Sequence, residues 1–283
     1  MDFISFENAS ECYEQTKAFL LRDEAVNNLI ISILIRLADG TGKWGDEPPW
    51  LYAVQEGGEV VACVVRTPPY KLLLTEADPE VTDFITESLN HLGASIPGSQ
   101  GPKATAARFA AQWSVLTGLR ARLHMSQRIY QLDQVTPVSG VEGYWELATE
   151  ADLDLLIPWE IAFAEDVRVQ TGDIEQQVRR QLMGQHIQLW KNPLPVSMAA
   201  WNGPTPSGMR IGPVYTPPEH RNHGYASANV AALSQRMLDS GRRFCFLYTD
   251  LANPVSNSIY QQIGYRQVCD VDEYDFDMEN TNA

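Results

Sequence analysis

Along residues 211–241 the hydrophobic pattern changes from that of a strand to that of a helix. An apolar run at 211–215 precedes the breaker pair Pro217-Pro218 and a polar stretch at 221–226. Apolar residues then recur at the spacing of one helix face, and Ser240-Gly241 predicts the helix end. These apolar positions are Ala226, Val230, Leu233, Met237 and Leu238. The pattern predicts a strand, a loop and a helix start, in that order.

The loop before this helix has the features of an anion-binding site. The first N–H groups of a helix have no intrahelical acceptor and carry the positive end of the helix dipole, so they attract phosphate. Gly224 lies at the helix start, where the absence of a Cβ lets the backbone approach a ligand closely. His220, Arg221 and His223 add local basic character. Residues 221–226 are therefore expected to bind a phosphate or pyrophosphate.

The segments on either side predict further helices and strands. Residues 144–148 have a strand-like pattern, and Thr149 is expected to cap a helix that continues toward Glu165, kinked or divided at Pro158. A second helix is predicted from Asp173 to about Met183, followed by strands at 188–190, 196–201 and 209–216. Residues 244–248 form a short continuous apolar run, which is typical of a strand buried on both faces.

The Arg-x-x-Gly-x-Ala spacing of residues 221–226, after a predicted strand, resembles the acyl-CoA loop of the GNAT superfamily of N-acetyltransferases. Further residues follow in the family's order, namely Asn253-Pro254, Asn257, Tyr260 and Gly264-Tyr265. The resemblance covers roughly Tyr144 to Met278. It implies a GNAT-like mixed central sheet flanked by helices, of the α+β or α/β class. It also implies acetyl-CoA as co-substrate, with no metal.

The N-terminal half carries a weaker version of the same pattern. Its predicted elements are a strand at 3–6, helices at 11–21 and 25–37, a hairpin around Gly57-Gly58, a helix at 79–92, a Pro-, Gly- and Ser-rich stretch at 95–102, a helix at 104–116 and a strand at 124–132. The run at 65–69, Val-Arg-Thr-Pro-Pro, echoes Val-Tyr-Thr-Pro-Pro at 214–218, but no glycine-bearing loop follows it. A linker near 135–140 divides the chain.

This pattern predicts two tandem GNAT-like domains, a degenerate one at 1–138 and a catalytic one at 139–283. The degenerate half is expected to bind no acyl-CoA and to wall the acceptor groove. The alternative is an unrelated α+β cap.

Composition limits the function classes. The 283 residues are 44% hydrophobic and 20% charged, as in an ordinary globular protein. The formal net charge of −15 argues against a nucleic-acid partner and would favour a cationic amine, although it could simply maintain solubility. No apolar run reaches the length of a membrane span, the N-terminus lacks a basic signal region, and the four cysteines show no metal-ligand spacing. We expect a cytoplasmic protein without a membrane partner, either monomer or homodimer.

The resemblance assigns roles to individual residues. The backbone of Val214, Tyr215 and Thr216 is expected to pair with the pantetheine arm of acetyl-CoA. The pyrophosphate is expected on Arg221, Asn222, His223, Gly224, Tyr225 and Ala226, with Tyr225 using its N–H rather than its hydroxyl. Asn253 and Asn257 are expected to face the cofactor, but Asn253 could equally cap the next helix. Tyr260 occupies the family position of the acid that protonates the leaving thiolate, and the alternative is a core anchor.

Acetyl transfer to an amine also needs a base, because a free alkylamine with a pKa of about 10.4 is charged at neutral pH. The sequence does not identify this base; Glu165, Asp166 and Glu219 are candidates. No cysteine lies in the loop or its helix, so direct transfer in a ternary complex is preferred to a covalent acetyl-enzyme. The acceptor, expected to be a small-molecule amine, could also be an antibiotic amine, an amino acid or a protein N-terminus. The alternative function is a non-catalytic acyl-CoA sensor.

Overall fold

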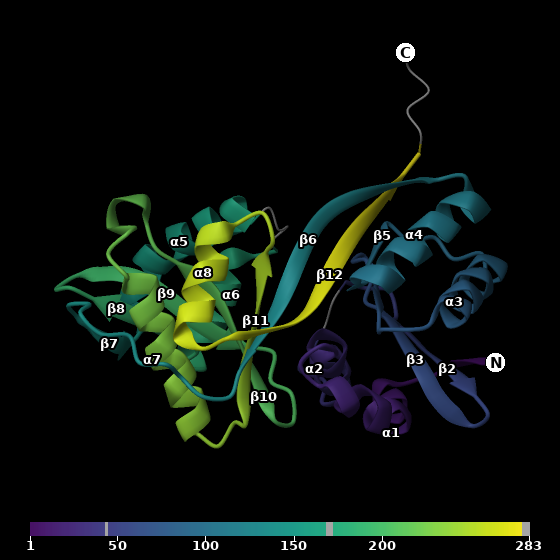
Figure 1. Ribbon diagram of the computed structural model, residues 1–283, viewed down its shortest axis with the longest axis horizontal. Helices are drawn as coiled ribbons and strands as arrows, with labels where there is room; N and C mark the ends of the chain where they lie inside the picture. Colours follow the sequence, from purple (N-terminus) through teal and green to yellow (C-terminus); the bar gives the residue numbers. More distant parts are fainter. Residues whose placement is uncertain (43–44, 168–171, 279–283) are drawn as a thin grey trace, which may run out of the picture. The chain divides into compact units, whose positions relative to one another are not determined.

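The computed structural model describes residues 1–42, 45–167 and 172–278. The chain forms two compact units (Figure 1). Unit 1 comprises Met1–Ile129 together with Val268–Ala283, and unit 2 comprises Tyr130–Gln267. These units differ from the predicted ranges 1–138 and 139–283, because the end of the chain belongs to the first unit.

Unit 1 is a mixed sheet with four helices from the N-terminal half. Its elements are β1 (Asp2–Ser5), α1 (Ala9–Leu20), α2 (Asn28–Ala38), β2 (Trp50–Glu56), β3 (Glu59–Arg66), β4 (Leu72–Leu74), α3 (Pro79–His91), β5 (Gly98–Pro102), α4 (Lys103–Thr117) and β6 (Arg120–Leu132). Its strands lie in the order β1-β2-β3-β4-β5-β12-β6. The predicted hairpin at Gly57-Gly58 joins β2 to β3, and both glycines have the positive φ that a tight turn requires.

Unit 2 repeats this succession of elements. In chain order the second half contains β7 (Tyr144–Leu147), α5 (Leu153–Val167), α6 (Ile174–Met183), β8 (Ile187–Lys191), β9 (Pro195–Asn202), β10 (Gly208–Tyr215), α7 (Tyr225–Asp239), β11 (Phe244–Asp250), α8 (Pro254–Ile263) and β12 (Arg266–Asp277), and β12 belongs to unit 1 from Val268 onward. Short 3₁₀ turns at Glu150–Asp152 and Pro218–His220 precede α5 and α7. The strand order is β6-β11-β10-β9-β8-β7, and β6 belongs to this unit from Tyr130 onward. Because both halves follow the order β-α-α-β-β-β-α-β-α-β, the predicted tandem repeat is confirmed.

The predicted kink at Pro158 does not divide the helix, because α5 runs without interruption from Leu153 to Val167. Helices α5 and α6 cover one face of the sheet of unit 2, where Leu156 and Val178 pack on Leu189 and Met198. Helices α7 and α8 cover the other face, and their side chains pack on β10 and β11 (Figure 1). Two apolar layers therefore hold the sheet between two helix pairs.

The last strand of the chain completes the sheet of unit 1. Strand β12 pairs antiparallel with β5, with Val271 opposite Pro102 and Asp275 opposite Gly98. The stretch at 95–102 therefore contains a strand, and its glycines permit it. A Cβ on Gly98 would collide with the Tyr274 carbonyl, and one on Gly101 would lie 2.9 Å from the Leu74 carbonyl oxygen.

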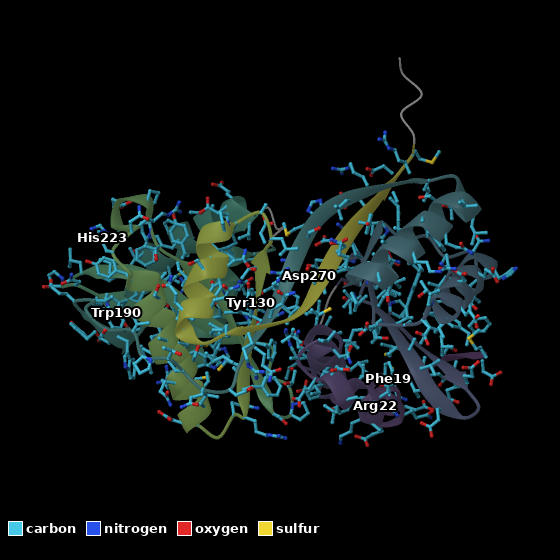
Figure 2. All side chains as sticks on the ribbon, in the orientation of Figure 1. Phe19, Arg22, Tyr130, Trp190, His223 and Asp270 are labelled. Carbon is cyan, nitrogen blue, oxygen red and sulfur yellow. The ribbon has the colours of Figure 1, made fainter. Side chains whose placement is uncertain are left out.

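Ion pairs also hold β12 in place within unit 1. Lys71 lies 2.6 Å from Glu273, and Arg128 donates two hydrogen bonds to Asp270, whose pKa these contacts lower (Figure 2).

Candidate functional site

The candidate site begins where β10 and β11 separate. The two strands pair in parallel only at the start of β10, where Gly208, Met209 and Arg210 lie opposite Phe244, Cys245 and Phe246. A bulge between Ile211 and Val214 then shifts β10, which continues to pair with β9 up to Tyr215. Among the described residues, the end of β10 therefore has no ladder partner on the β11 side. Free backbone groups at such an edge can pair with an extended ligand.

Hydrogen bonds between polar side chains fix the position of the end of β10. Thr216 Oγ1 donates to Ser197 Oγ (3.0 Å), which in turn donates to the Tyr215 carbonyl (3.2 Å). On α7, Asn229 Nδ2 donates to the Ser197 carbonyl (3.1 Å), and Gln188 Nε2 on β8 donates to Asn229 Oδ1 (3.0 Å). This network links β8, β9, β10 and α7. Sequence reasoning missed it, although Asn229 lies on the apolar face of α7, where a polar residue needs buried partners.

The loop after β10 leads into α7 with its amides free. Asn222 and Gly224 have positive φ angles of 65° and 78°, and Gly224 is the N-cap without a side-chain capping bond. The N–H groups of residues 222–227 donate to no acceptor among the described residues. A Cβ on Gly224 would also lie 2.9 Å from Val141 Cγ2, so glycine is required there for space as well as for conformation. The predicted phosphate loop thus has the backbone geometry of an anion site.

The Arg221 side chain folds back along the loop. Its Nε donates to the Thr216 carbonyl (2.9 Å), Nη2 pairs with Asp166 at the end of α5 (2.9 Å), and the guanidinium lies 5.9 Å from the Tyr215 ring. Both members of the ion pair are about half exposed, so the pair is weak, roughly 0–1 kcal/mol. An incoming phosphate can therefore replace Asp166 at little cost.

The other two side chains of the loop interact within the protein. The His223 ring stacks on Tyr225 with centroids 5.4 Å apart, and its Nδ1 bonds to the Arg221 carbonyl (2.8 Å; Figure 2). Asn192 Nδ2 donates to the Tyr225 hydroxyl (2.9 Å). The hydroxyl is thus engaged by the protein, which leaves the N–H of Tyr225 for a ligand. Ala226 follows in the first turn of α7.

The asparagines at α8 have structural contacts. Asn253 Oδ1 accepts from the Ser256 N–H (3.1 Å) and caps α8. Asn257 Oδ1 accepts from Thr249 (2.7 Å) and from Tyr130 (3.1 Å), which is labelled in Figure 2. The Asn257 Nδ2 donates to two backbone carbonyls, including that of Asn253 (2.7 Å). The Asn257 amide is thus fully used in attaching α8 to β11 and β6, and a cofactor contact from it would require one of these bonds to break.

Tyr260 lies one turn after Asn257 on α8. It packs on the core layer that also receives Val214, and its ring meets Tyr265 edge-on with centroids 5.9 Å apart. Burial raises the pKa of its phenol to about 12. Its hydroxyl makes no hydrogen bond with the described residues. Tyr260 is thus both a core residue and a protonated donor without a partner.

Glu160 is the most unusual acid of unit 2, and sequence reasoning missed it. It lies on the buried face of α5 with Leu153, Leu156 and Ala164, and only 4% of it is exposed. Its Oε1 is buried without a hydrogen bond, and Gln181 on the neighbouring helix α6 has the same property. Burial raises the pKa of Glu160 from its ordinary value of 4.5 to about 7. The sequence signal for Glu160 was its place in the helical spacing 153–156–160–164, whose other members are apolar.

The three acids suggested from the sequence lie on the surface. Glu165, Asp166 and Glu219 are exposed, and Asp166 is paired with Arg221. Cys245 is buried under α7, and burial raises its pKa to about 12, which makes it a poor nucleophile. Within the described residues, no group of three or more His, Cys, Asp or Glu side chains is placed to hold a metal ion. No helix that the structure describes is both long and apolar enough to cross a membrane.

Unit 1 offers a contrast at the matching place. In element order β4, β5 and α3 correspond to β10, β11 and α7. The echo at 65–69 begins at the end of β3, the counterpart of β9, and is therefore not structurally equivalent to 214–218. The true counterpart of the loop, residues 75–78, has no glycine and is followed by Pro79, which has no N–H. Glu76, Asp78 and Glu80 make this helix start acidic.

In unit 1 the strands β4 and β5, which correspond to β10 and β11, do not separate. Strands β4 and β5 pair in parallel at Leu72 and Leu73, and Leu74 still lies against Gly101.

Comparison with known proteins shows which fold this chain resembles. Residues 189–274 match the family model described as FR47-like protein, and no curated protein matches the chain. A GNAT-family acetyltransferase from Colwellia psychrerythraea superposes with a TM-score of 0.60 and 10% identity over 98% of this chain and 100% of that one. A GCN5-related N-acetyltransferase from Sphaerobacter thermophilus gives 0.62 and 14% over 96% and 94%.

A tandem GNAT protein from the clavulanic acid biosynthesis pathway gives a TM-score of 0.54 and 11% identity over 99% of both chains. At these identities the similarity concerns the fold. The chain therefore has the fold of the GNAT acetyltransferases in a tandem arrangement, and its residues 189–274 match the FR47-like family.

Proposed function

We propose that unit 2 transfers an acetyl group from acetyl-CoA to an amine by direct attack within a ternary complex. The observation that carries the proposal is the row of free N–H groups at residues 222–227, next to the separated end of β10. The first feature suits a pyrophosphate and the second suits the amide-containing pantetheine chain. The GNAT fold supports acyltransferase activity in general; the cofactor and the amine acceptor are the specific parts of this proposal.

Each part of acetyl-CoA has fitting residues in unit 2. The N–H groups of residues 222–227 would hold the pyrophosphate, and Arg221 would add a charge-assisted hydrogen bond after leaving Asp166. The backbone of Val214 to Thr216 would hold the pantetheine arm, at the strand end that Ser197 positions. When bound, acetyl-CoA supplies the thioester whose carbonyl carbon the amine attacks.

Tyr260 would stabilise the leaving sulfur. With a pKa of about 12, its phenol stays protonated at neutral pH. A leaving thiol has a pKa of about 8.5, so complete proton transfer from Tyr260 would be uphill by about 5 kcal/mol. Tyr260 would therefore donate a hydrogen bond to the developing thiolate, which receives its proton from water or from the amine.

Calorimetric titration with acetyl-CoA tests the site. We expect one molecule bound per chain, because the matching loop of unit 1 lacks a glycine and is acidic. Gly224→Glu should abolish binding, since it adds a negative charge and a side chain at the phosphate seat. Gly241→Glu is the matched control, because Gly241 lies at the other end of α7 with a positive φ of 97° and nothing within 4 Å of its Cβ position.

Equal losses of affinity in the two variants would contradict the assignment, since the effect would then come from backbone strain alone. Tight binding by the native protein without acetylation of any amine would favour the sensor function instead.

A further inference from the structure

Glu160 has a carboxyl group whose hydrogen-bonding capacity is unused. Oε1 is enclosed without a partner. Oε2 likewise makes no hydrogen bond to the described residues, but it is not fully enclosed. Buried polar atoms in folded proteins are nearly always paired, so an unpaired carboxylate is a marker of a ligand site. The carboxyl group thus has one oxygen that is buried without a partner and one that is not fully enclosed.

The position of Glu160 on α5 places it beside the proposed acetyl-CoA site. The preceding residue, Trp159, packs on Tyr215 at the end of β10, with ring centroids 6.1 Å apart. Further along the helix, Asp166 pairs with Arg221 of the phosphate loop. Glu160 lies between these two contacts, on the helix face that is buried with Tyr215 in one apolar layer.

The missing partner must be a hydrogen-bond donor. Both enclosed, unpartnered side-chain oxygens of this helix pair, on Glu160 and on Gln181, are acceptors. No cation among the described residues fills the role, because burial is the one cause of the raised pKa of Glu160. A primary ammonium supplies three donors and the opposite charge, and the net charge of −15 attracts it.

The described titratable groups on the elements packed against α5 are engaged elsewhere or exposed. They are Glu150, Asp152, Asp173, Glu175, Arg179, Arg180, Lys191, Arg210 and Tyr215. On α5 itself, Asp154, Glu165 and Asp166 are exposed.

We propose that Glu160 binds the ammonium group of the acceptor and takes its first proton, so that the acceptor is a primary amine that is cationic in solution. This inference rests on the proposed function of unit 2. The ammonium gives one proton to the Glu160 carboxylate, and the nitrogen lone pair then forms the N–C bond to the acetyl group. The C–S bond breaks with its electron pair on sulfur. Nitrogen loses a second proton, sulfur gains one, and Glu160 releases one to solvent.

Glu160→Gln tests this inference, because glutamine keeps the shape and removes the charge. Rates are measured with acetyl-CoA and a panel of primary alkylamines and diamines. We expect kcat/KM for the amine to fall by roughly 10²–10⁴-fold, the usual effect of losing a positioned base. The wild-type rate should decline below about pH 7, where Glu160 is protonated, and the variant should lose this decline. Asp154→Asn removes an exposed carboxylate from the same helix and should leave the rates unchanged.

Amine binding is a readout independent of turnover. With CoA in place of acetyl-CoA no transfer occurs, and calorimetry should detect amine binding to the native protein and its loss in Glu160→Gln. Acetyl-CoA affinity should be equal in both proteins. Wild-type kcat/KM and amine affinity in Glu160→Gln would overturn the role of Glu160 and leave the proposed function intact. Failure of the native protein to bind acetyl-CoA would overturn both.

Discussion

Removing the charge of Glu160 should stabilise the protein at alkaline pH. In the folded state the pKa of Glu160 is about 7, above its ordinary value of 4.5. Below pH 4.5 both the folded and the unfolded states hold the proton, and folding is not affected by the carboxyl charge. Between pH 4.5 and about 7 the unfolded state has lost this proton while the folded state, with the carboxyl in an apolar layer, still holds it, so wild-type stability falls over this range. Above about pH 7 both states are ionised and the difference stays constant.

The size of this effect follows from the pKa difference. A shift from 4.5 to about 7, at about 1.4 kcal/mol per unit, corresponds to about 3 kcal/mol. Glu160→Gln carries no charge at any pH, so its unfolding free energy relative to wild type should rise by this amount between pH 4.5 and pH 8.5. For a chain of this size, this corresponds to a relative increase in Tm of roughly 6–12 °C.

Urea unfolding followed by tryptophan fluorescence, at a series of pH values, measures the difference directly. Other titrating groups are common to both proteins and cancel in the comparison. Asp154→Asn is the control, because its carboxylate is exposed on the same helix and its stability should follow the wild-type curve. Parallel curves for wild type and Glu160→Gln across this range would refute the reasoning, since they would show that the carboxyl has a compensating partner.

Two further predictions concern the acetyl-CoA site. Asp166→Asn should tighten acetyl-CoA binding by roughly two- to tenfold at low salt, because it frees Arg221 and removes a negative charge near the pyrophosphate. This gain in affinity should shrink as ionic strength rises. Weaker binding in calorimetry would instead mean that Asp166 holds Arg221 in its binding position. Tyr260→Phe should lower kcat by roughly 10–100-fold, the worth of one hydrogen bond to a charged group, with acetyl-CoA affinity unchanged; wild-type turnover would show that Tyr260 serves the core alone.

Much of the fold was predictable because its determinants are local. The continuous apolar run at 244–248, the Gly57-Gly58 turn and the helix start at Asp173, whose Oδ1 accepts from the Gln176 N–H (2.9 Å), act over a few residues. The same is true of the loop at 221–226, where a positive φ at Gly224 and the start of α7 depend on neighbouring residues. Such features depend on short-range sterics and hydrogen bonds, which the sequence shows directly.

Two properties of the site were visible as patterns but could not be interpreted from the sequence. Glu160 and Asn229 both occupy the apolar face of a helix, which marks each of them as a buried polar residue. Helical spacing does not show whether such a buried polar side chain has a hydrogen-bond partner. The structure shows that Asn229 has a partner in Ser197 and that Glu160 has none among the described residues.

The remaining features depend on contacts between residues far apart in the chain. The strand pattern of β12 is clear in the sequence, but its pairing with β5, more than a hundred residues earlier, depends on the bare backbone of Gly98 and Gly101. Arg221 meets Asp166 only because α5 packs along β10. The sequence by itself determined the elements, their order and the loop that suits a phosphate, because these follow from short-range forces. Only the tertiary structure decided which sheet β12 completes and that Glu160 is buried without a hydrogen-bond partner among the described residues. Both depend on how segments far apart in the chain pack together and exclude water.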